Sequence, residues 1–258
     1  MAEKDLIYQV DGHVATVTIN RAPARNAITF ETVGLFHAAL NQAQADPLVR
    51  VICVTGAGDK AFCSGADLGG GMQDDAGRRS HFDNYARLIS RLSEFPKPTV
   101  ARVNGHCLAG GTGFMLACDI VIAKASAQFG TPEVNVGLFP MMIGALIFRN
   151  VPRKKAMEMI LLGERLTAAQ ALEMGMVTRV VPDADFDAEL ARVLAALSAK
   201  SPIGLRMGKE AFAAVEQMPQ AEAVRLLAGK LVEVSGTRDA REGITAFLEK
   251  RAPHFKGE

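Results

Sequence analysis

The sequence has 258 residues, enough for one large domain with its own buried core. Its 29 basic residues nearly balance 28 acidic ones, and no run of five or more like charges occurs, so the composition gives no electrostatic support for binding nucleic acid or a membrane surface. Residues 1–5 lack the basic start and apolar stretch of a secretory signal, and the most apolar region, 107–123, is broken by three glycines and Asp119, so we expect a cytoplasmic protein without a membrane span.

The first sixty residues predict a hairpin, a helix and a buried strand. An Asp-Gly turn separates two runs, 6–10 and 14–19, that read as paired strands. A helix is expected to begin after the cap residue Thr29 and to end before Pro47. The apolar run 49–54 then predicts a strand buried on both faces.

Residues 56–80 contain seven glycines, which predicts a long loop, and long loops in compact domains are often functional. Residues 56–61 match the loose dinucleotide-binding pattern G-x-G-x-x-A. Because Gly65 falls where that motif requires a helix, we reject a Rossmann site. Ser64 lacks the first glycine of G-x-S-x-G, so it is not a nucleophile elbow.

Downstream, strands and helices continue to alternate, which favours the α/β class. The expected elements are a helix around residues 85–92, a strand at 99–103, a small-residue helix at 110–117, strands at 119–123 and 177–181, and a helix with a capping box at 167–170 that ends at Gly175.

After Pro182 the pattern becomes wholly helical, with candidate helices at 185–200, 202–216 and 239–251. We interpret this shift as a core domain, residues 1–198, followed by a helical region, residues 199–258, that serves oligomerisation.

Four cysteines stand singly, without a C-x-x-C pair and without a histidine at metal-ligand spacing: Cys53, Cys63, Cys107 and Cys118. We expect reduced structural thiols and no metal site.

Five short motifs occur in order along nearly the whole chain. They are residues 26–28 (NAI), 61–68 (AFCSGADL), 103–113 (VNGHCLAGGTG), 129–133 (FGTPE) and 246–251 (AFLEKR). Together they resemble the crotonase superfamily of enoyl-CoA hydratases and isomerases.

The resemblance implies an α/β fold that is a crotonase-like spiral of ββα units with a helical C-terminal trimerisation region. It implies an acyl-CoA substrate, in which coenzyme A is part of the substrate and no separate cofactor is needed. It also implies assembly as a homotrimer or a homohexamer.

The same resemblance places two backbone N–H donors of an oxyanion hole at Ala66 and Gly110. Small residues suit this task because a backbone amide needs an unobstructed approach to the oxygen on which an enolate concentrates its charge. The expected position of Gly110 at a helix start, where N–H groups lack intrahelical partners, also favours an anion.

Coenzyme A is expected to lie across the turn that contains Arg25 and Ala27 and to approach Lys250 with its adenine end. The remaining implied contacts come from Gly110 and from the loop residues Ser64, Ala66, Asp67 and Leu68. Ordinary surface charge is the alternative interpretation of Arg25 and Lys250.

Hydratases of this superfamily use two glutamates, and here the chain departs from the pattern. Glu133 occupies one position, but the other is Gly113. A single carboxylate suffices to move a proton between two carbons, so we favour double-bond isomerisation, with Glu133 as the proton carrier, over hydration. Decarboxylation and non-catalytic CoA binding or assembly are the alternatives.

Two further expectations concern the surroundings of Glu133. The apolar residues after it, between 134 and 142, form either a wall that raises its pKa and admits a hydrocarbon chain or ordinary core. A replacement second acid could come from the glycine-rich loop and the residues next to it, where the candidates are Asp74, Asp75, His81, Asp83 and Tyr85.

Overall fold

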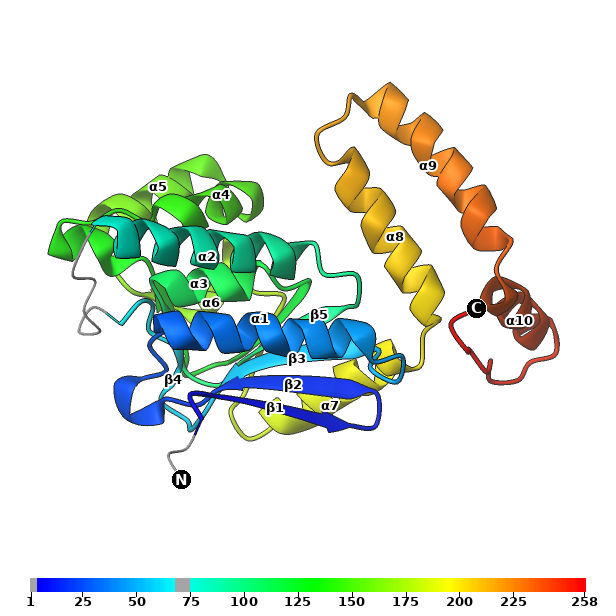
Figure 1. Cartoon of the computed structure of the whole chain (residues 1–258), viewed down its shortest axis with the longest axis horizontal. Helices are drawn as coiled ribbons and strands as arrows, with labels where there is room; N and C mark the ends of the chain where they lie inside the picture. Colours follow the sequence, from blue (N-terminus) through cyan, green and yellow to red (C-terminus); the bar gives the residue numbers. More distant parts are fainter. Residues whose placement is uncertain (1–3, 68–74) are drawn as a thin grey trace.

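The computed structural model describes residues 4–67 and 75–258 (Figure 1). Its strands are β1 (Leu6–Asp11), β2 (Val14–Ile19), β3 (Val51–Gly56), β4 (Ala61–Cys63), β5 (Thr99–Val103), β6 (His106–Leu108), β7 (Ile120–Lys124), β8 (Gln128–Gly130), β9 (Leu166–Thr167) and β10 (Arg179–Val181). The α-helices are α1 (Phe30–Ala45), α2 (Asp75–Ser93), α3 (Gly110–Leu116), α4 (Met141–Asn150), α5 (Arg153–Leu162), α6 (Ala168–Glu173), α7 (Phe186–Ser198), α8 (Pro202–Val215), α9 (Gln220–Ser235) and α10 (Arg238–Leu248). Two short 3₁₀ helices, η1 (Ala22–Ala24) and η2 (Pro132–Val136), complete the set.

The larger sheet has the strand order β1-β2-β3-β5-β7-β10. The predicted hairpin is confirmed, because β1 and β2 pair antiparallel from Leu6↔Ile19 to Asp11↔Val14. All later pairings in this sheet are parallel. Every residue of β3 is buried, as expected for a strand that is covered on both faces.

The smaller sheet, β4-β6-β8-β9, corrects the prediction of one uninterrupted loop over residues 56–80. Residues 61–63 form β4, which pairs with β6 from Ala61↔His106, and α2 already begins at Asp75. The glycines on either side of β4 made a three-residue strand impossible to recognise from composition. The short strands of this sheet lead directly into the residues that form the candidate site.

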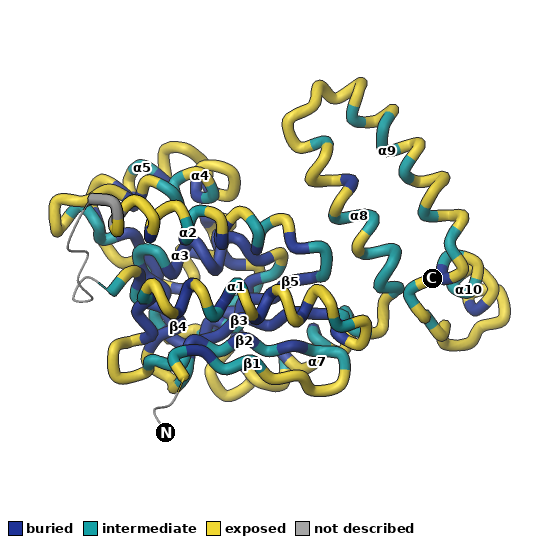
Figure 2. Tube along the Cα trace, in the orientation of Figure 1, coloured by how far each residue is buried: buried dark blue, intermediate teal, exposed yellow. Residues whose placement is uncertain are grey.

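Alternate residues of the larger sheet point to opposite faces and enter two separate cores. Ile52 and Val54 face the main core under α1, α2 and α3, where Phe36 stacks on Phe114 at 5.3 Å between ring centroids. Val51 and Cys53 face the second core, which α7 closes with Phe186, Leu190 and Val193. Figure 2 accordingly shows the buried segments concentrated around the larger sheet and the helices that cover it.

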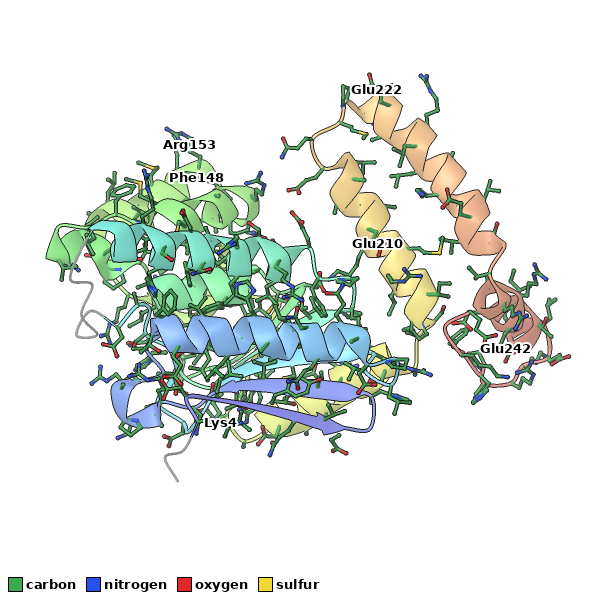
Figure 3. All side chains as sticks on the ribbon, in the orientation of Figure 1. Lys4, Phe148, Arg153, Glu210, Glu222 and Glu242 are labelled. Atoms are coloured by element: carbon green, nitrogen blue, oxygen red, sulfur yellow. The ribbon has the colours of Figure 1, made fainter. Side chains whose placement is uncertain are left out.

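Helices α8, α9 and α10 form an arm that extends from the rest of the chain (Figures 1 and 2). Figure 3 labels Glu222 at the tip of this arm and Glu242 on α10. Arg50 donates to the carbonyl oxygens of Ser198 and Phe255, both at 3.0 Å, and fixes the base of the arm. The arm exposes several large apolar side chains: Phe212, Val224, Leu231, Val232, Ile244, Phe247 and Leu248. Its role in oligomerisation stays a prediction.

Three helices were missing from the sequence-based expectations. The sequence predicted three helices after Pro182, whereas the structure has four, because α9 was not recognised. Helices α4 and α5 were also missed, and Arg153 of α5 lies over the ring of Phe148 of α4 at 5.8 Å (Figure 3). Among the described residues, no helix is both long enough and apolar enough to cross a lipid bilayer.

Candidate functional site

Ala66 lies on a short extended segment that runs beside Ile28. The Ile28 amide donates to the Gly65 carbonyl oxygen at 2.8 Å, and the Asp67 amide donates to the Ile28 carbonyl oxygen at 2.9 Å. Backbone polar groups of successive residues in an extended chain point in opposite directions. The N–H of Ala66 is therefore directed away from Ile28, and Ala66 itself is exposed.

Gly110 is the first residue of α3, and the turn before it fixes the direction of its amide. Ala109 has φ 50° and ψ −130°, its N–H donates to the Gly130 carbonyl oxygen at 2.9 Å, and its carbonyl accepts from the Thr112 amide at 2.9 Å. Because the C=O and N–H of one peptide point in opposite directions, the Gly110 N–H is directed out of the N-terminal end of α3. An amide at this helical position has no intrahelical acceptor.

The two donor loops meet at Gly65. A Cβ atom on Gly65 would lie 2.6 Å from the Cβ of Ala109 and 3.1 Å from the amide nitrogen of Gly110. The φ of Gly65 is also +99°, a conformation that side chains disfavour. Glycine at position 65 therefore allows the Ala66 and Gly110 amides to lie on adjacent segments.

Glu133 is half-buried in η2, the short 3₁₀ helix that follows β8. Within the described part of the chain, its Oε2 atom is buried and has no hydrogen-bond partner. Burial raises the pKa of this carboxyl group, and a hydrogen bond from its own backbone N–H offsets part of the rise. A partly desolvated carboxylate with a free oxygen has the properties of a general base.

Tyr85 of α2 contacts the turn that carries Gly110. Its hydroxyl donates to the carbonyl oxygen of Gly110, and its ring is buried. Burial raises the pKa of Tyr85 well above its ordinary value, and the negative charge of Glu133 acts in the same direction. The phenol therefore keeps its proton and serves as the hydrogen-bond donor.

Gly113 lies on α3 one turn after Gly110, and the space beside it is already filled. A Cβ atom at position 113 would lie 2.5 Å from Cγ2 of Ile143, 3.0 Å from the Tyr85 hydroxyl and 3.1 Å from Cδ1 of Ile89. Any side chain there would require its neighbours to move. Close packing is thus the physical reason for glycine at this position.

The sequence matches the family described as enoyl-CoA hydratase/isomerase over residues 9–258. The chain belongs to this family. It is similar to the enoyl-CoA hydratase EchA19 of Mycobacterium tuberculosis, with 35% identity over 257 residues that cover 98% of this chain and 96% of the relative. It is also similar to the 2,3-dehydroadipyl-CoA hydratase of Escherichia coli, with 36% identity over 261 residues that cover 98% of this chain and 99% of the relative.

Solved structures of the family share the whole fold. An enoyl-CoA hydratase from Bacillus anthracis superimposes with a TM-score of 0.94 at 30% identity and covers 99% of this chain and 100% of its own. The human enoyl-CoA hydratase domain-containing protein 3 gives the same TM-score at 29% identity. The predicted α/β crotonase-like fold is therefore confirmed.

The residues that the family resemblance assigned to coenzyme A fall into two groups. Ala27 is buried, and the exposed Arg25 has φ 52° in the turn that precedes Ile28, beside the segment of Ser64, Ala66 and Asp67. Leu68 lies outside the described residues. Lys250 is exposed and follows α10, which lies at the opposite end of the molecule from β4 (Figure 1). Within one chain, Lys250 is not brought to the other predicted contacts.

The candidates for a second acid are placed differently from one another. His81 is buried, burial lowers its pKa, and its ring centroid lies 6.2 Å from that of Phe30. Asp83 is exposed. Asp74 and the side chain of Asp75 lie outside the described residues. Of the three candidates whose side chains the structure describes, Tyr85 is the one seen in contact with the Gly110 turn.

Most of the apolar residues after Glu133 do not form ordinary core. Val136, Leu138, Phe139 and Met141 are all more than 40% exposed, whereas Met142 is partly buried and packs against the main core. The exposure of these four residues contradicts the core interpretation for them, because they lie at the end of η2, in the connection to α4 and at the first position of α4.

Sequence reasoning missed Arg21, which joins the two sides of the candidate coenzyme A turn. One of its guanidinium nitrogens donates to the Ala27 carbonyl oxygen at 2.6 Å and to the Asp67 carboxylate at 2.9 Å. Its Nε lies 3.0 Å from the Asp5 carboxylate. No motif or spacing marks this arginine, because its partners are distant in sequence.

Two asparagines that are fully buried fix the surrounding loops. The Asn26 amide donates to the carbonyl oxygens of Ala57 at 3.0 Å and Ala61 at 2.7 Å. The Asn104 amide donates to those of Gly56 at 2.8 Å and Gly58 at 2.6 Å. Both residues lie in motifs that resemble the family, and their contacts fix the connection from β3 to β4, the strand that precedes Ala66.

The four cysteines are free and buried. Burial raises the pKa of the Cys53 and Cys63 thiols to about 12, so both are protonated near neutral pH. Over residues 4–67 and 75–258, no group of three or more histidine, cysteine, aspartate or glutamate side chains could hold a metal ion.

Proposed function

We propose that the protein binds an enoyl-CoA and moves its carbon–carbon double bond. The Ala66 and Gly110 amides stabilise the thioester enolate, and Glu133 carries the proton. The observation that supports isomerisation over hydration is the packing at Gly113, where the side chains of Ile143, Tyr85 and Ile89 occupy the space that a second carboxylate would need, so that they would have to move to admit one.

The reaction needs only one proton carrier. The Glu133 carboxylate takes a proton from C2 of a 3-enoyl-CoA, and the electron pair of that C–H bond moves toward the thioester oxygen. The resulting dienolate carries negative charge that two backbone N–H donors can stabilise. Glu133 then returns the proton to C4, so that the double bond shifts from C3–C4 to C2–C3 and no water is consumed.

The environment of Glu133 suits this task. A raised pKa makes the carboxylate a stronger base, and within the described residues its Oε2 atom has no hydrogen-bond partner that would compete for a proton. Loss of one oxyanion donor typically lowers kcat by about 10²–10³, so each of the two amides is a large contribution.

A labelled substrate tests the proton carrier. A 3-enoyl-CoA with deuterium at C2 should give a 2-enoyl-CoA in which part of the deuterium appears at C4, because one carboxylate carries it between the two carbons. Glu133→Gln should abolish this transfer. Glu158→Gln is the matched control, since Glu158 is an exposed surface residue. Wild-type rates in Glu133→Gln would refute the assigned role.

Hydration is the second candidate, and the names of the relatives favour it. It requires a water held by another group, because Gly113 supplies none. Decarboxylation and acyl-CoA binding without turnover are the remaining alternatives, and a panel of acyl-CoA thioesters distinguishes them by product.

We also propose that coenzyme A lies across the Arg25 turn and the Ser64–Asp67 segment. Lys250 could join this site only from the arm of a second copy, because its own arm extends away from it. The trimeric or hexameric assembly is part of this proposal, and sedimentation of the purified protein tests it.

A further inference from the structure

Tyr85 reaches the candidate site from α2 and fills the space between two glycines of α3. A Cβ atom on either Gly110 or Gly113 would lie 3.0 Å from its hydroxyl oxygen. The ring packs edge-on against Phe114 at 5.3 Å between centroids, with an interplanar angle of 82°. The hydroxyl is therefore held at a defined point and donates to the Gly110 carbonyl oxygen.

The turn that Tyr85 contacts has an unfavourable backbone conformation. Ala109 has φ 50° and ψ −130°, a region that alanine rarely occupies. Such conformations cost of order 1–3 kcal/mol and persist only where the surrounding structure holds them. The ψ angle of Ala109 also orients the peptide whose N–H belongs to Gly110.

Three hydrogen bonds hold this turn. The Ala109 N–H donates to the Gly130 carbonyl oxygen, and the Thr112 N–H donates to the Ala109 carbonyl oxygen, so both bonds fix the peptides around Ala109. The Tyr85 hydroxyl holds the next peptide, Gly110–Gly111, by donating to the Gly110 carbonyl oxygen. It is the one of the three that comes from a different helix.

The Tyr85 hydroxyl keeps its proton. Burial and the nearby charge of Glu133 both raise the pKa of Tyr85, so the phenol is neutral in the pH range where Glu133 is ionised. A neutral phenol donates one hydrogen bond, and here the Gly110 carbonyl accepts it.

We propose that Tyr85 is a positioning residue, whose hydrogen bond to the Gly110 carbonyl holds the Gly110–Gly111 peptide and thereby supports the strained turn at Ala109 in the conformation that directs the Gly110 N–H toward the thioester oxygen. This inference rests on the proposed function, because it assumes that the Gly110 amide contacts the substrate. Tyr85 acts through Gly110 and contacts no reacting atom.

The chain provides a matched control for this role. It has two tyrosines, and the other, Tyr8, lies on β1 with a buried hydroxyl that has no hydrogen-bond partner within the described residues. Tyr85→Phe and Tyr8→Phe thus remove the same atom from a buried position. One removal breaks a bond to the turn at Gly110, and the other breaks none that the structure shows.

The infrared band of the thioester carbonyl, measured for a ¹³C-labelled saturated acyl-CoA, reports the oxyanion donors directly. Binding to the wild type should lower the carbonyl frequency. Binding to Tyr85→Phe should lower this frequency by a smaller amount. The kcat of Tyr85→Phe should fall about tenfold with a nearly unchanged KM, a smaller loss than the 10²–10³ of a complete donor. Tyr8→Phe should match the wild type in both measurements.

The possible outcomes distinguish failure of the positioning role of Tyr85 from failure of the oxyanion hole. If the wild type itself shows no frequency shift on binding, the oxyanion hole is wrong. If the wild type shows the shift and Tyr85→Phe retains both the full shift and wild-type kcat, the positioning role is overturned. Should Tyr85→Phe fail to fold, the wild-type crystal structure with a bound acyl-CoA decides. The Tyr85 hydroxyl must then still contact the Gly110 carbonyl, and a hydroxyl that contacts the acyl group instead overturns the proposal.

Discussion

Ile143 of α4 and Gly113 of α3 are packed so closely that a Cβ atom on residue 113 would lie 2.5 Å from Cγ2 of Ile143. The two residues come from helices that pack against each other, and Gly113 stands at the position where the family resemblance leads us to expect a glutamate in a hydratase. This contact connects the local packing of the chain to its proposed reaction.

Gly113→Ala tests the packing. Alanine is favoured over glycine in a helix by about 1 kcal/mol, but an extra methyl in a filled site typically costs about 1–3 kcal/mol. We expect a net loss of about 1 kcal/mol in the free energy of unfolding, measured by urea denaturation. Gly144→Ala is the control, because a Cβ there meets nothing within 4 Å and should stabilise the protein. Equal stabilisation by both substitutions would contradict the packing argument.

The double substitution Gly113→Glu/Ile143→Ala tests the consequence for catalysis. Trimming Ile143 removes the closest obstacle and gives a glutamate room beside Gly110. General acid–base groups contribute about 10²–10⁴ in rate, so hydration of a 2-enoyl-CoA should rise at least about tenfold. Ile143→Ala alone should not raise it. A folded double variant without any gain would show that the missing carboxylate does not limit hydration.

Glu133→Gln should change stability in a pH-dependent way. Because burial raises the folded-state pKa of Glu133, its favourable contribution to folding is fully present below the ordinary pKa and is lost as pH rises through the folded value. At neutral pH the ionised carboxylate therefore destabilises the fold, and glutamine should raise the melting temperature. The difference should shrink as the pH is lowered toward 4. A lower melting temperature for Glu133→Gln at neutral pH would contradict this assignment.

Arg21→Ala should loosen the turn on which coenzyme A is proposed to lie. The guanidinium connects Ala27 to Asp67 across two segments, and hydrogen bonds to charged groups contribute roughly 1.5–3 kcal/mol. We expect lower stability and a raised KM for acyl-CoA substrates, with a smaller change in kcat. Arg21→Lys keeps the charge but loses the forked geometry, so it should fall between the wild type and alanine. An unchanged KM in both variants would show that Arg21 does not contribute to the binding of acyl-CoA substrates.

The sequence predicted the elements that carry strong local signals. The Asp-Gly turn placed the first hairpin, and the cap at Thr29 and the capping box at Thr167 were confirmed as the starts of α1 and α6. Helix α9 was missed because it contains Gly229 and none of its residues is buried in the chain, so no apolar stripe faces a core. Strand β4 was missed because three residues between glycines carry no periodicity.

The candidate site was predictable in part. Ala66, Gly110 and Glu133 were named from motifs, and the structure places Gly65 against the turn that carries Gly110 and brings the Tyr85 hydroxyl to the Gly110 carbonyl oxygen. Nothing in the spacing of Tyr85, Gly113 and Ile143 could reveal that their atoms meet, because that contact depends on how α2, α3 and α4 pack. The function of Arg21 as a connection between Ala27 and Asp67 depends on the fold in the same way.

Double-bond isomerisation is tested most directly by comparing two substrates of the same acyl length on the purified protein. One is a 3-enoyl-CoA, followed for migration of the double bond, and the other is the 2-enoyl-CoA, followed for addition of water. With Glu133 as the proton carrier and no carboxylate at Gly113, kcat/KM for bond migration should exceed that for hydration at least about tenfold. Hydration that is as fast as bond migration, or faster, would contradict isomerisation as the main reaction.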